Sequence, residues 1–403
     1  MQKCRVCGQN ITPFFSLGKI PLVNTFLKRN QLKKEIRYDL TVAFCKECYL
    51  VQLTKDISPS KLFKNYIYFS STSKSLIEYF GKTAKYLAKK LGLNKKSLVL
   101  EIASNDGILL AFFKQMGIGI LGIDPAVNVA RVANKKGIKT IPEFFNYRFA
   151  KKLKAKKVEA DLVYGANVLA HVPKIVDFAK GVNTVLKPKG TAIFEFPYLK
   201  GLLEGKFDII YHEHVFYYSL IALKNLFIKA NLEIYNVELT KAQGGSLRIY
   251  VCHKQAFPIR KSVFKLVEVE QKMGFDKINT YKRMNRNVKK LKRDLIARLK
   301  KIKREGKTIA AYSAPAKGNI LLNYFGVNNN FLEYIVDKAK EKQGLYTPGT
   351  HMLVYPPEKI AEQIPDYLLV LCWNITDEIV KQLSWYKRKG GKFLIPVPQL
   401  KVI

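Results

Sequence analysis

Four cysteines form two pairs that have the spacing of metal ligands. Two residues separate Cys4 from Cys7, and two separate Cys45 from Cys48. Each pair can give two thiolates to one tetrahedral zinc ion, and a site with four protein ligands is closed and structural. A redox pair uses the same spacing and is the alternative. Because the stretch between the pairs is longer than in most zinc ribbons, we expect a small sheet to fill it.

The densest group of proton-transfer side chains is the run Tyr211, His212, Glu213 and His214, which holds two of the five histidines. A histidine acts as base or acid near neutral pH, and a neighbouring carboxylate can tune its pKa. If the run were a strand, both imidazoles would share one face, so a metal site is one alternative. A structural charged cluster is another, because such networks also arise without function.

Acidic and amide side chains follow apolar runs that read as buried parallel strands. One run contains Glu101 and opens into Asn105 and Asp106, and the next ends in Asp124. The carboxyl ends of parallel strands share one crevice, where such an acid takes ribose hydroxyls. The turn lacks the glycine pattern of a dinucleotide site, which favours adenosine and is the usual arrangement for S-adenosylmethionine. A strand–helix–strand unit without a ligand is the alternative.

Two further strand ends add side chains to the same crevice. Phe144 follows the short strand expected at residues 138–141, and an aromatic ring there could sandwich an adenine. Asn167 and His171 follow the next apolar run and face the same crevice.

Two other segments carry polar side chains that could meet a ligand. Tyr66 and Tyr68 precede a run of hydroxyl residues. They line a polar pocket in one interpretation and form an aromatic hinge between two domains in the other. Residues 314–319 form a small-residue loop before a helix that we expect to begin near Ile320. Such a loop can seat a phosphate, and Lys317 adds positive charge.

The elements that position these side chains alternate between strands and helices. This alternation predicts a doubly wound α/β sheet, closed by an antiparallel edge at residues 243–251. A lysine-rich helical connector follows from 258 to about 305, and a second α/β unit follows the connector. The expected helices are at residues 76–91 and 108–116, and the expected strands are at 98–102, 121–124, 138–141, 161–166, 191–197, 307–313, 332–336, 367–372 and 392–396.

Composition limits the class of protein. A chain of 403 residues is too long for one typical core and indicates two or three domains. No apolar run approaches the ~20 residues of a membrane span. The first cysteine, at position 4, leaves no room for a signal peptide, so we expect a cytoplasmic chain without disulfides. The net charge of +39 favours anionic partners, but the lysines are spread along the chain, which makes nucleic acid a weaker expectation.

The order of these motifs over the full length resembles the sugar C-methyltransferase family of deoxysugar biosynthesis. The resemblance joins the two cysteine pairs to later segments at residues 101–107, 167–173, 211–214, 244–248, 314–319, 343–350 and 373–374. It implies an α/β fold with three domains. These are a zinc-binding domain at residues 1–62, a Rossmann-like class I methyltransferase domain at 63–256, and a Rossmann-like nucleotide-sugar domain at 257–403. One departure is Ala103, where the family more often has glycine, and this puts cofactor affinity in question.

The resemblance also implies a reaction. A methyl group would pass from S-adenosylmethionine to a carbon next to the ketone of a nucleotide-linked 4-keto-6-deoxy sugar, with dTDP as the expected nucleotide. Such a carbon must first lose a proton, which needs a base and stabilisation of the enolate oxygen. We expect His214 to be the base, Glu213 to orient or tune it, and Tyr211 to bind the sugar or the enolate.

The remaining expected site residues fall into three groups. The cofactor-binding group is Glu101, Ser104, Asn105, Asp106, Gly107, Asp124, Phe144, Asn167 and His171. The substrate-binding group is Tyr66, Tyr68, Ser246, Arg248, Tyr312, Lys317 and Asn319. The zinc ligands are Cys4, Cys7, Cys45 and Cys48. We expect a monomer or weak homodimer with no membrane or nucleic-acid partner. The alternatives are an RNA methyltransferase with a zinc domain and a non-catalytic nucleotide-binding protein.

Overall fold

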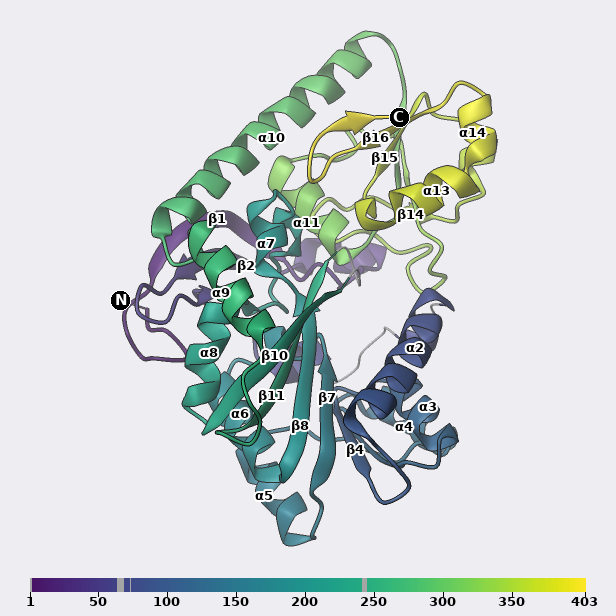
Figure 1. The fold of residues 1–403 in the computed structure, drawn as a ribbon. Helices are drawn as coiled ribbons and strands as arrows, with labels where there is room; N and C mark the ends of the chain where they lie inside the picture. Colours follow the sequence, from purple (N-terminus) through teal and green to yellow (C-terminus); the bar gives the residue numbers. More distant parts are fainter. Residues whose placement is uncertain (1, 64–68, 73, 241–244) are drawn as a thin grey trace.

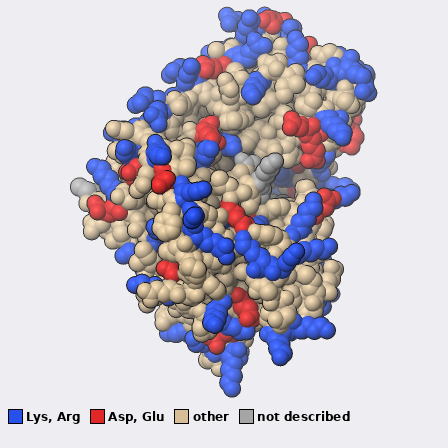
Figure 2. All heavy atoms as spheres, in the orientation of Figure 1, with Lys and Arg blue, Asp and Glu red and all other residues tan. Residues whose placement is uncertain are grey.

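The structure is a computed structural model that describes residues 2–63, 69–72, 74–240 and 245–403. These residues form a four-stranded, a seven-stranded and a six-stranded sheet (Figure 1). One hydrophobic core contains buried side chains from all three sheets, so the three parts are packed together. None of the helices among the described residues is long and apolar enough to cross a bilayer. Figure 2 shows Lys and Arg side chains scattered over one face of the molecule, with no single element collecting them.

The four-stranded sheet belongs mainly to the N-terminal part of the chain. Its strands pair antiparallel in the order β1, β2, β3, β9. β1 and β2 lie between the two cysteine pairs, so the sheet predicted for that stretch is present. The strands are β1 (Thr12–Pro21), β2 (Arg37–Phe44), β3 (Val51–Leu53) and β9 (Phe216–Tyr217).

The seven-stranded sheet has the order β10-β11-β8-β7-β4-β5-β6. The five strands from β8 to β6 are parallel, and β11 is antiparallel to β8 and to β10. The predicted Rossmann-like sheet is confirmed. The strand that we expected at its edge, β11, is instead the second strand, because β10 lies outside it. The strands are β4 (Leu98–Ile102), β5 (Gly119–Ile123), β6 (Thr140–Ile141), β7 (Ala160–Ala166), β8 (Leu186–Pro197), β10 (Leu232–Thr240) and β11 (Ser246–His253).

The two faces of this sheet bury different helices, because side chains alternate along a strand. On β4, Val99 joins a core with the helices α2 and α3, whereas Leu100 and Ile102 join the larger core with α5 and α6. The sheet is therefore covered on both faces. A ligand can reach it at the carboxyl ends of its strands, where the helices leave space. The helices of this part are α2 (Lys74–Leu91), α3 (Ile108–Gln115), α4 (Val127–Lys135), α5 (Tyr147–Ala155), α6 (Ile175–Val185), α7 (Leu199–Leu203) and α8 (Leu220–Ile228).

The expected connector is two helices, α9 (Lys261–Lys272) and α10 (Ile278–Arg304). They are separated at Gly274, whose φ of 72° is readily adopted only by glycine and ends the first helix. In Figure 1, α10 runs along the side of the molecule from the N-terminal sheet to the C-terminal part. Its apolar stripe begins with Tyr281, which packs between Phe14 and Phe44 of the N-terminal sheet.

The six-stranded sheet has the order β14-β13-β12-β15-β16-β17, with only β17 antiparallel. Helix α11 (Ala316–Phe325) begins earlier than predicted, because Pro315 has the extended conformation that starts a helix. Lys317 therefore lies in the first helical turn and not in a loop. The other elements are β12 (Ile309–Tyr312), β13 (Ile335–Val336), β14 (Val354–Tyr355), β15 (Tyr367–Val370), β16 (Lys392–Ile395), β17 (Lys401–Val402), α12 (Lys359–Glu362), α13 (Thr376–Gln382) and α14 (Ser384–Arg388).

Candidate active site

The four paired cysteines converge on one point. Their Sγ atoms lie within 4.8 Å of one another, and the Cys4–Cys48 and Cys7–Cys45 distances are each 3.4 Å. A tetrahedral zinc ion with Zn–S bonds of about 2.3 Å holds its sulfurs about 3.8 Å apart, so the group fits zinc. Burial raises the pKa of the Cys45 thiol to about 11, and a bound cation would supply the charge that favours its thiolate.

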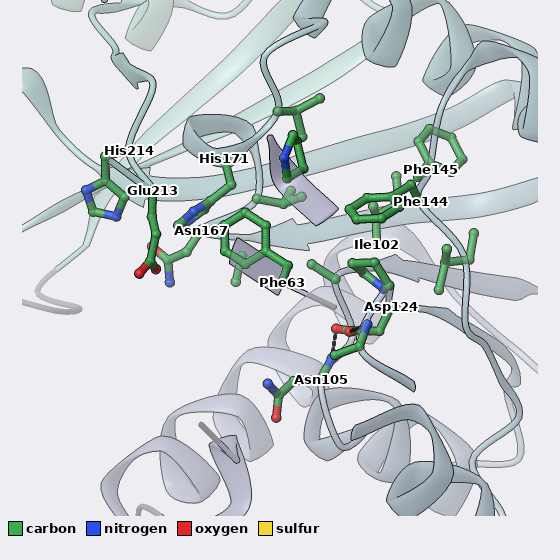
Figure 3. Close-up of a pocket in the computed structure, with 18 of the residues that line it drawn as sticks. Phe63, Ile102, Asn105, Asp124, Phe144, Phe145, Asn167, His171, Glu213 and His214 are labelled. Carbon is green, nitrogen blue, oxygen red and sulfur yellow. Dashed lines mark hydrogen bonds between the residues drawn. The ribbon is translucent and has the colours of Figure 1, made fainter. Parts of the chain in front are cut away.

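A cavity of about 350 Å³, here called the active cavity, lies at the carboxyl ends of β4, β5 and β7. Three residues of the 211–214 loop, together with residues of the N-terminal part and of α11, also line it. Figure 3 shows its two ends, which the labelled side chains define. One end has Asp124, Phe144 and Phe145, the other has His171, Glu213 and His214, and Asn167 and Phe63 lie between them.

Asp124 is held by backbone amides at the first end. Its Oδ2 accepts a hydrogen bond from the Asn105 N–H, and its Oδ1 accepts one from the Ala126 N–H, both at 2.9 Å. Asn105 has φ of 50°, so the turn after β4 curls back toward β5. Burial raises the pKa of Asp124, although the two amides oppose this. Each oxygen keeps a lone pair for a further donor, which suits ribose hydroxyls.

Glu101 borders a second, smaller cavity of about 90 Å³, which Ser104, Asn105 and Asn167 also line. Its Oε2 is buried and has no hydrogen-bond partner among the described residues. Burial, followed by the neighbouring carboxylates, raises the pKa of Glu101 well above its usual range. A buried acceptor of this kind fits a cationic ligand group such as the amino group of S-adenosylmethionine.

Two phenylalanines complete the end near Asp124. Phe145 is buried against Phe178, with 5.3 Å between ring centroids. Phe144 is 37 % exposed and lines the active cavity, so part of its ring is available to an aromatic ligand. This arrangement fits the adenine of an adenosyl group.

At the other end, both nitrogens of His214 have partners. Its Nδ1 lies 2.9 Å from the Ile209 carbonyl oxygen, and its Nε2 lies 2.8 Å from the Tyr211 hydroxyl. A carbonyl only accepts, so Nδ1 carries the proton and Nε2 is the basic atom. Burial, followed by the neighbouring His171, lowers the pKa of His214 well below its usual range, which keeps the ring neutral.

Glu213 and His171 face the same end of the cavity. The Glu213 Oε1 accepts a hydrogen bond of 2.6 Å from the Asn24 side chain, and burial raises the pKa of Glu213 to about 7. Burial also lowers the pKa of His171 to about 4, and its ring lies 5.0 Å from that of His214. Because both nitrogens of His214 are already engaged, Ile209 and Tyr211 orient that ring, and Glu213 does not, contrary to expectation.

Lys317 brings the positive charge of this end. Its Nζ lies 5.0 Å from the centroid of the Trp373 ring, whose Nε1–H donates to Asp208 at 2.5 Å. Burial lowers the pKa of Lys317, whereas the Asp208 carboxylate opposes this. The 314–319 motif, where a phosphate site was expected, therefore places Lys317 at the active cavity.

Several expected site residues have structural partners instead. Asp106 accepts hydrogen bonds from Lys136 at 2.9 Å and from the Ser71 N–H at 3.3 Å. Its carboxylate therefore links three segments of the protein. Gly107 has φ of 82°, and a Cβ there would lie 2.7 Å from the Ile138 side chain, so it allows close packing. His212 donates to the Tyr38 carbonyl, so the two histidines do not form a metal pair.

Apart from Lys317, the expected substrate residues of the later motifs do not line the active cavity. Arg248 is buried in an ion pair with Glu195 at 2.8 Å, and Asn319 donates to the Val23 carbonyl. Ser246 lines a separate cavity beside Glu195, and Tyr312 is buried on β12, away from the residues that line the active cavity. Tyr66 and Tyr68, also expected at the substrate, lie outside the described residues.

Sequence reasoning missed the contribution of the N-terminal part to the active cavity. Asn24, Pro59 and Phe63 line it, and Asn24 bonds Glu213 across a separation of 189 residues. No motif surrounds Asn24, because its role depends on the packing of two distant segments. The aromatic residues near this segment, Phe63, Tyr66 and Tyr68, were the one available sequence signal.

These features define an S-adenosylmethionine-dependent methyltransferase with a zinc-binding domain. Three family profiles match in sequence: a zinc binding domain at residues 4–63, a methyltransferase domain at 75–237 and a C-methyltransferase C-terminal domain at 241–398. The C-methyltransferase NovU of Streptomyces niveus is 33% identical over 407 aligned positions, which cover 100% of this chain and 97% of NovU. The chain therefore belongs to the sugar C-methyltransferase family.

Solved structures with lower similarity match about half of the chain. Magnesium protoporphyrin IX methyltransferase from Synechocystis PCC 6803 is 13% identical, with a TM-score of 0.34 over 44% of this chain and 79% of that chain. The PH0226 protein of Pyrococcus horikoshii OT3 is 18% identical, with a TM-score of 0.38 over 50% of this chain and 100% of that chain. The full-length sequence match to NovU carries the assignment.

Proposed function

We propose that the enzyme methylates a carbon next to the ketone of a nucleotide-linked 4-keto-6-deoxy sugar, with dTDP as the nucleotide. One observation carries this proposal: a single cavity joins the adenosyl-type end at Asp124 to an end with a neutral histidine and a partly buried lysine. The similarity to the C-methyltransferase NovU supports transfer to carbon.

The residues of the first end would hold the cofactor. Asp124 would accept the ribose hydroxyls, Phe144 would contact the adenine, and Glu101 would face the amino group. When bound there, S-adenosylmethionine supplies an electrophilic methyl group. Phe63 and Pro59 also line the cavity and add apolar surface to its wall, and an apolar wall strengthens the electrostatic interactions inside a cavity.

The residues of the second end would generate the carbon nucleophile. His214 Nε2 accepts the proton from the carbon next to the ketone, since Nδ1 is already protonated against the Ile209 carbonyl. The Tyr211 hydroxyl, which donates to Nε2 in the free enzyme, then donates to the enolate oxygen. Lys317 adds positive charge beside this oxygen or the diphosphate.

Replacement of the base is the direct test. A His214→Gln enzyme should lose about 10²–10⁴-fold in kcat, because general-base catalysis contributes about that much. The measurement is transfer of a labelled methyl group to dTDP-, UDP- and GDP-linked 4-keto-6-deoxy sugars.

His253→Gln is the matched control, because both nitrogens of its ring also have partners, the Asn183 side chain and the Leu186 carbonyl, and it does not line the active cavity. It should keep kcat within about threefold, because the change touches no residue of the cavity. Normal turnover by His214→Gln would remove His214 as the base. Methyl transfer to an RNA oligomer, and to none of the sugars, would overturn the proposed function.

A further inference from the structure

The 211–214 loop is attached to the sheet of the zinc-binding domain. β9 follows the loop directly and pairs with β3, with Val51 opposite Tyr217. The Leu53 N–H donates to the Val215 carbonyl at 2.8 Å, and His212 bonds the Tyr38 carbonyl at 3.3 Å. Main-chain and side-chain bonds on both sides of Glu213 therefore come from the zinc-binding domain.

Asn24 reaches the active cavity from a segment that is held at both ends. β1 ends three residues before it, at Pro21. The neighbouring Val23 carbonyl accepts a hydrogen bond of 2.9 Å from the buried Asn319 of α11, and Leu27 exchanges backbone hydrogen bonds with Tyr346. The Asn24 amide is thus fixed where its Nδ2 donates to Glu213 at 2.6 Å.

We propose that Asn24 is a positioning residue through which the zinc-binding domain holds the Glu213 carboxylate in the active cavity and favours its ionised form. The proposal rests on the proposed function in one respect: it takes the ionised Glu213 carboxylate, which lines the cavity beside His214, as a group that methyl transfer needs. It gives the zinc-binding domain a part in catalysis that a purely structural domain would not have.

The electrostatics of the cavity agree with this role. Burial raises the pKa of Glu213 to about 7, and the Asn24 hydrogen bond opposes the rise. The other titratable groups that face this end are Tyr211, His214, His171 and Lys317. His171 and His214 are neutral near pH 7, so they add no cation that could replace the donor amide.

Three variants separate the donor from its surroundings. Asn24→Leu removes the donor at similar volume, so no new water should enter and resolvate the carboxylate. Asn24→Asp keeps the shape but sets a second carboxyl against Glu213, and like charges disfavour ionisation. Asn285→Ala is the matched control. The Asn285 side-chain amide likewise donates a hydrogen bond, of 2.8 Å, to the Phe14 carbonyl, and Asn285 does not line the active cavity.

The first measurement needs no substrate. Infrared difference titration of the zinc-loaded protein follows the carboxyl band that Glu213→Gln abolishes. We expect the Glu213 midpoint to rise by about one pH unit in Asn24→Leu, since a hydrogen bond to a charged group is worth about that much, and by more in Asn24→Asp. Asn285→Ala should keep the wild-type midpoint. An unchanged midpoint in Asn24→Leu or Asn24→Asp, with normal zinc content and thermal midpoint, would overturn the proposal.

The second measurement is the pH dependence of methyl transfer. The acid limb of the kcat–pH profile should move to higher pH by the same amount in Asn24→Leu, with kcat at pH 7 about fivefold lower and recovered at higher pH, while KM changes less. A uniform loss of kcat at every pH would indicate a merely structural role and overturn the proposal. If wild-type enzyme methylates no nucleotide sugar, the proposed function fails, and the infrared titration still decides the role of Asn24.

Discussion

The two α/β units build the same turn and end it differently. In the first, Ala103 has φ of 58° and donates its N–H to the Ile123 carbonyl at 2.7 Å. In the second, Ser313 has φ of 69° and donates to the Val336 carbonyl at 2.7 Å. An aspartate follows each of these carbonyls, Asp124 in the first unit and Asp337 in the second.

The two aspartates also share their backbone partners. Asp124 accepts from the amides of Asn105 and Ala126 at 2.9 Å, and Asp337 accepts from those of Ala314 and Ala339 at 2.7 and 2.8 Å. The same frame thus holds a carboxylate at the end of the second strand in both units.

The difference lies in the third partner. Lys342 Nζ lies 3.2 Å from the Asp337 carboxylate and 3.1 Å from the Ala314 carbonyl. Burial alone would raise the pKa of Asp337, but Lys342 and the two amides outweigh it and hold the pKa low. Within the part of the chain that the structure describes, no cation pairs with Asp124, and burial raises its pKa. A Rossmann-like frame therefore offers its acid to a ligand only where the protein does not neutralise that acid itself.

Removal of each aspartate should give the largest contrast. Asp124→Ala should weaken S-adenosylhomocysteine binding at least about 100-fold, because two hydrogen bonds to a charged group are lost. Asp337→Ala should change this affinity less than about twofold, since its carboxylate is already paired. Isothermal titration calorimetry measures both. Each variant loses two equivalent amide contacts, so equal losses of affinity would mean that loss of these structural contacts, and not loss of the free carboxylate, weakens cofactor binding.

Replacement of Lys342 should make the second unit resemble the first. Lys342→Met should lower the free energy of unfolding by about 1–3 kcal/mol at pH 7, because a mostly buried carboxylate loses its cation. The folded-state pKa of Asp337 lies below 3.8, so its contribution is present above that pH and is lost as the pH falls through the lowered pKa. The difference from wild type should stay constant from about pH 7 to 5 and narrow below about 4.

Urea unfolding across this range checks the prediction, with Lys303→Met as the control. The Lys303–Glu333 pair is 37% and 34% exposed, so its loss should cost below about 1 kcal/mol. A loss of stability by Lys342→Met that persists at pH 3 would mean that packing of the lysine stem, and not the ion pair, supports the second unit.

The frame of both units was predictable from sequence, because it depends on local patterns. Apolar runs that end in Asp124 and Asp337 mark parallel strands, and such strands bring their carboxyl ends to one edge. The convergence of the four cysteines followed in the same way from their spacing. The helix start at Pro315 was a local signal that was read too late in the chain.

The partners of these residues were not predictable, because tertiary packing supplies them. Arg248 appeared suited to a substrate until the antiparallel register of β11 set it opposite Glu195. Asn24 meets Glu213 only when the N-terminal sheet accepts β9 as a strand. Lys342 lies in a loop whose return to Asp337 no periodicity indicates.

The smallest expected effect concerns the left-handed residues that begin the two turns. A non-glycine residue with positive φ destabilises the folded state by about 1–2 kcal/mol. Glycine removes this strain, but the larger entropy of its unfolded state cancels about half of the gain in stability. Ala103→Gly should therefore raise the thermal midpoint by about 1–2 °C. Ser313→Gly should gain less, because it also loses the hydrogen bond of 3.2 Å from the Ser313 hydroxyl to Asp337.

Calorimetry of both variants measures this order, and S-adenosylhomocysteine titration of Ala103→Gly adds a functional reading. Ala103 lines both the active cavity and the smaller cavity at Glu101, so removal of its methyl group should leave affinity equal or improve it by a few fold. A lower midpoint in Ala103→Gly would mean that contacts of the methyl group outweigh the backbone strain. The first turn would then be tuned by packing, and the strain shared with Ser313 would not explain why the two units differ in their use.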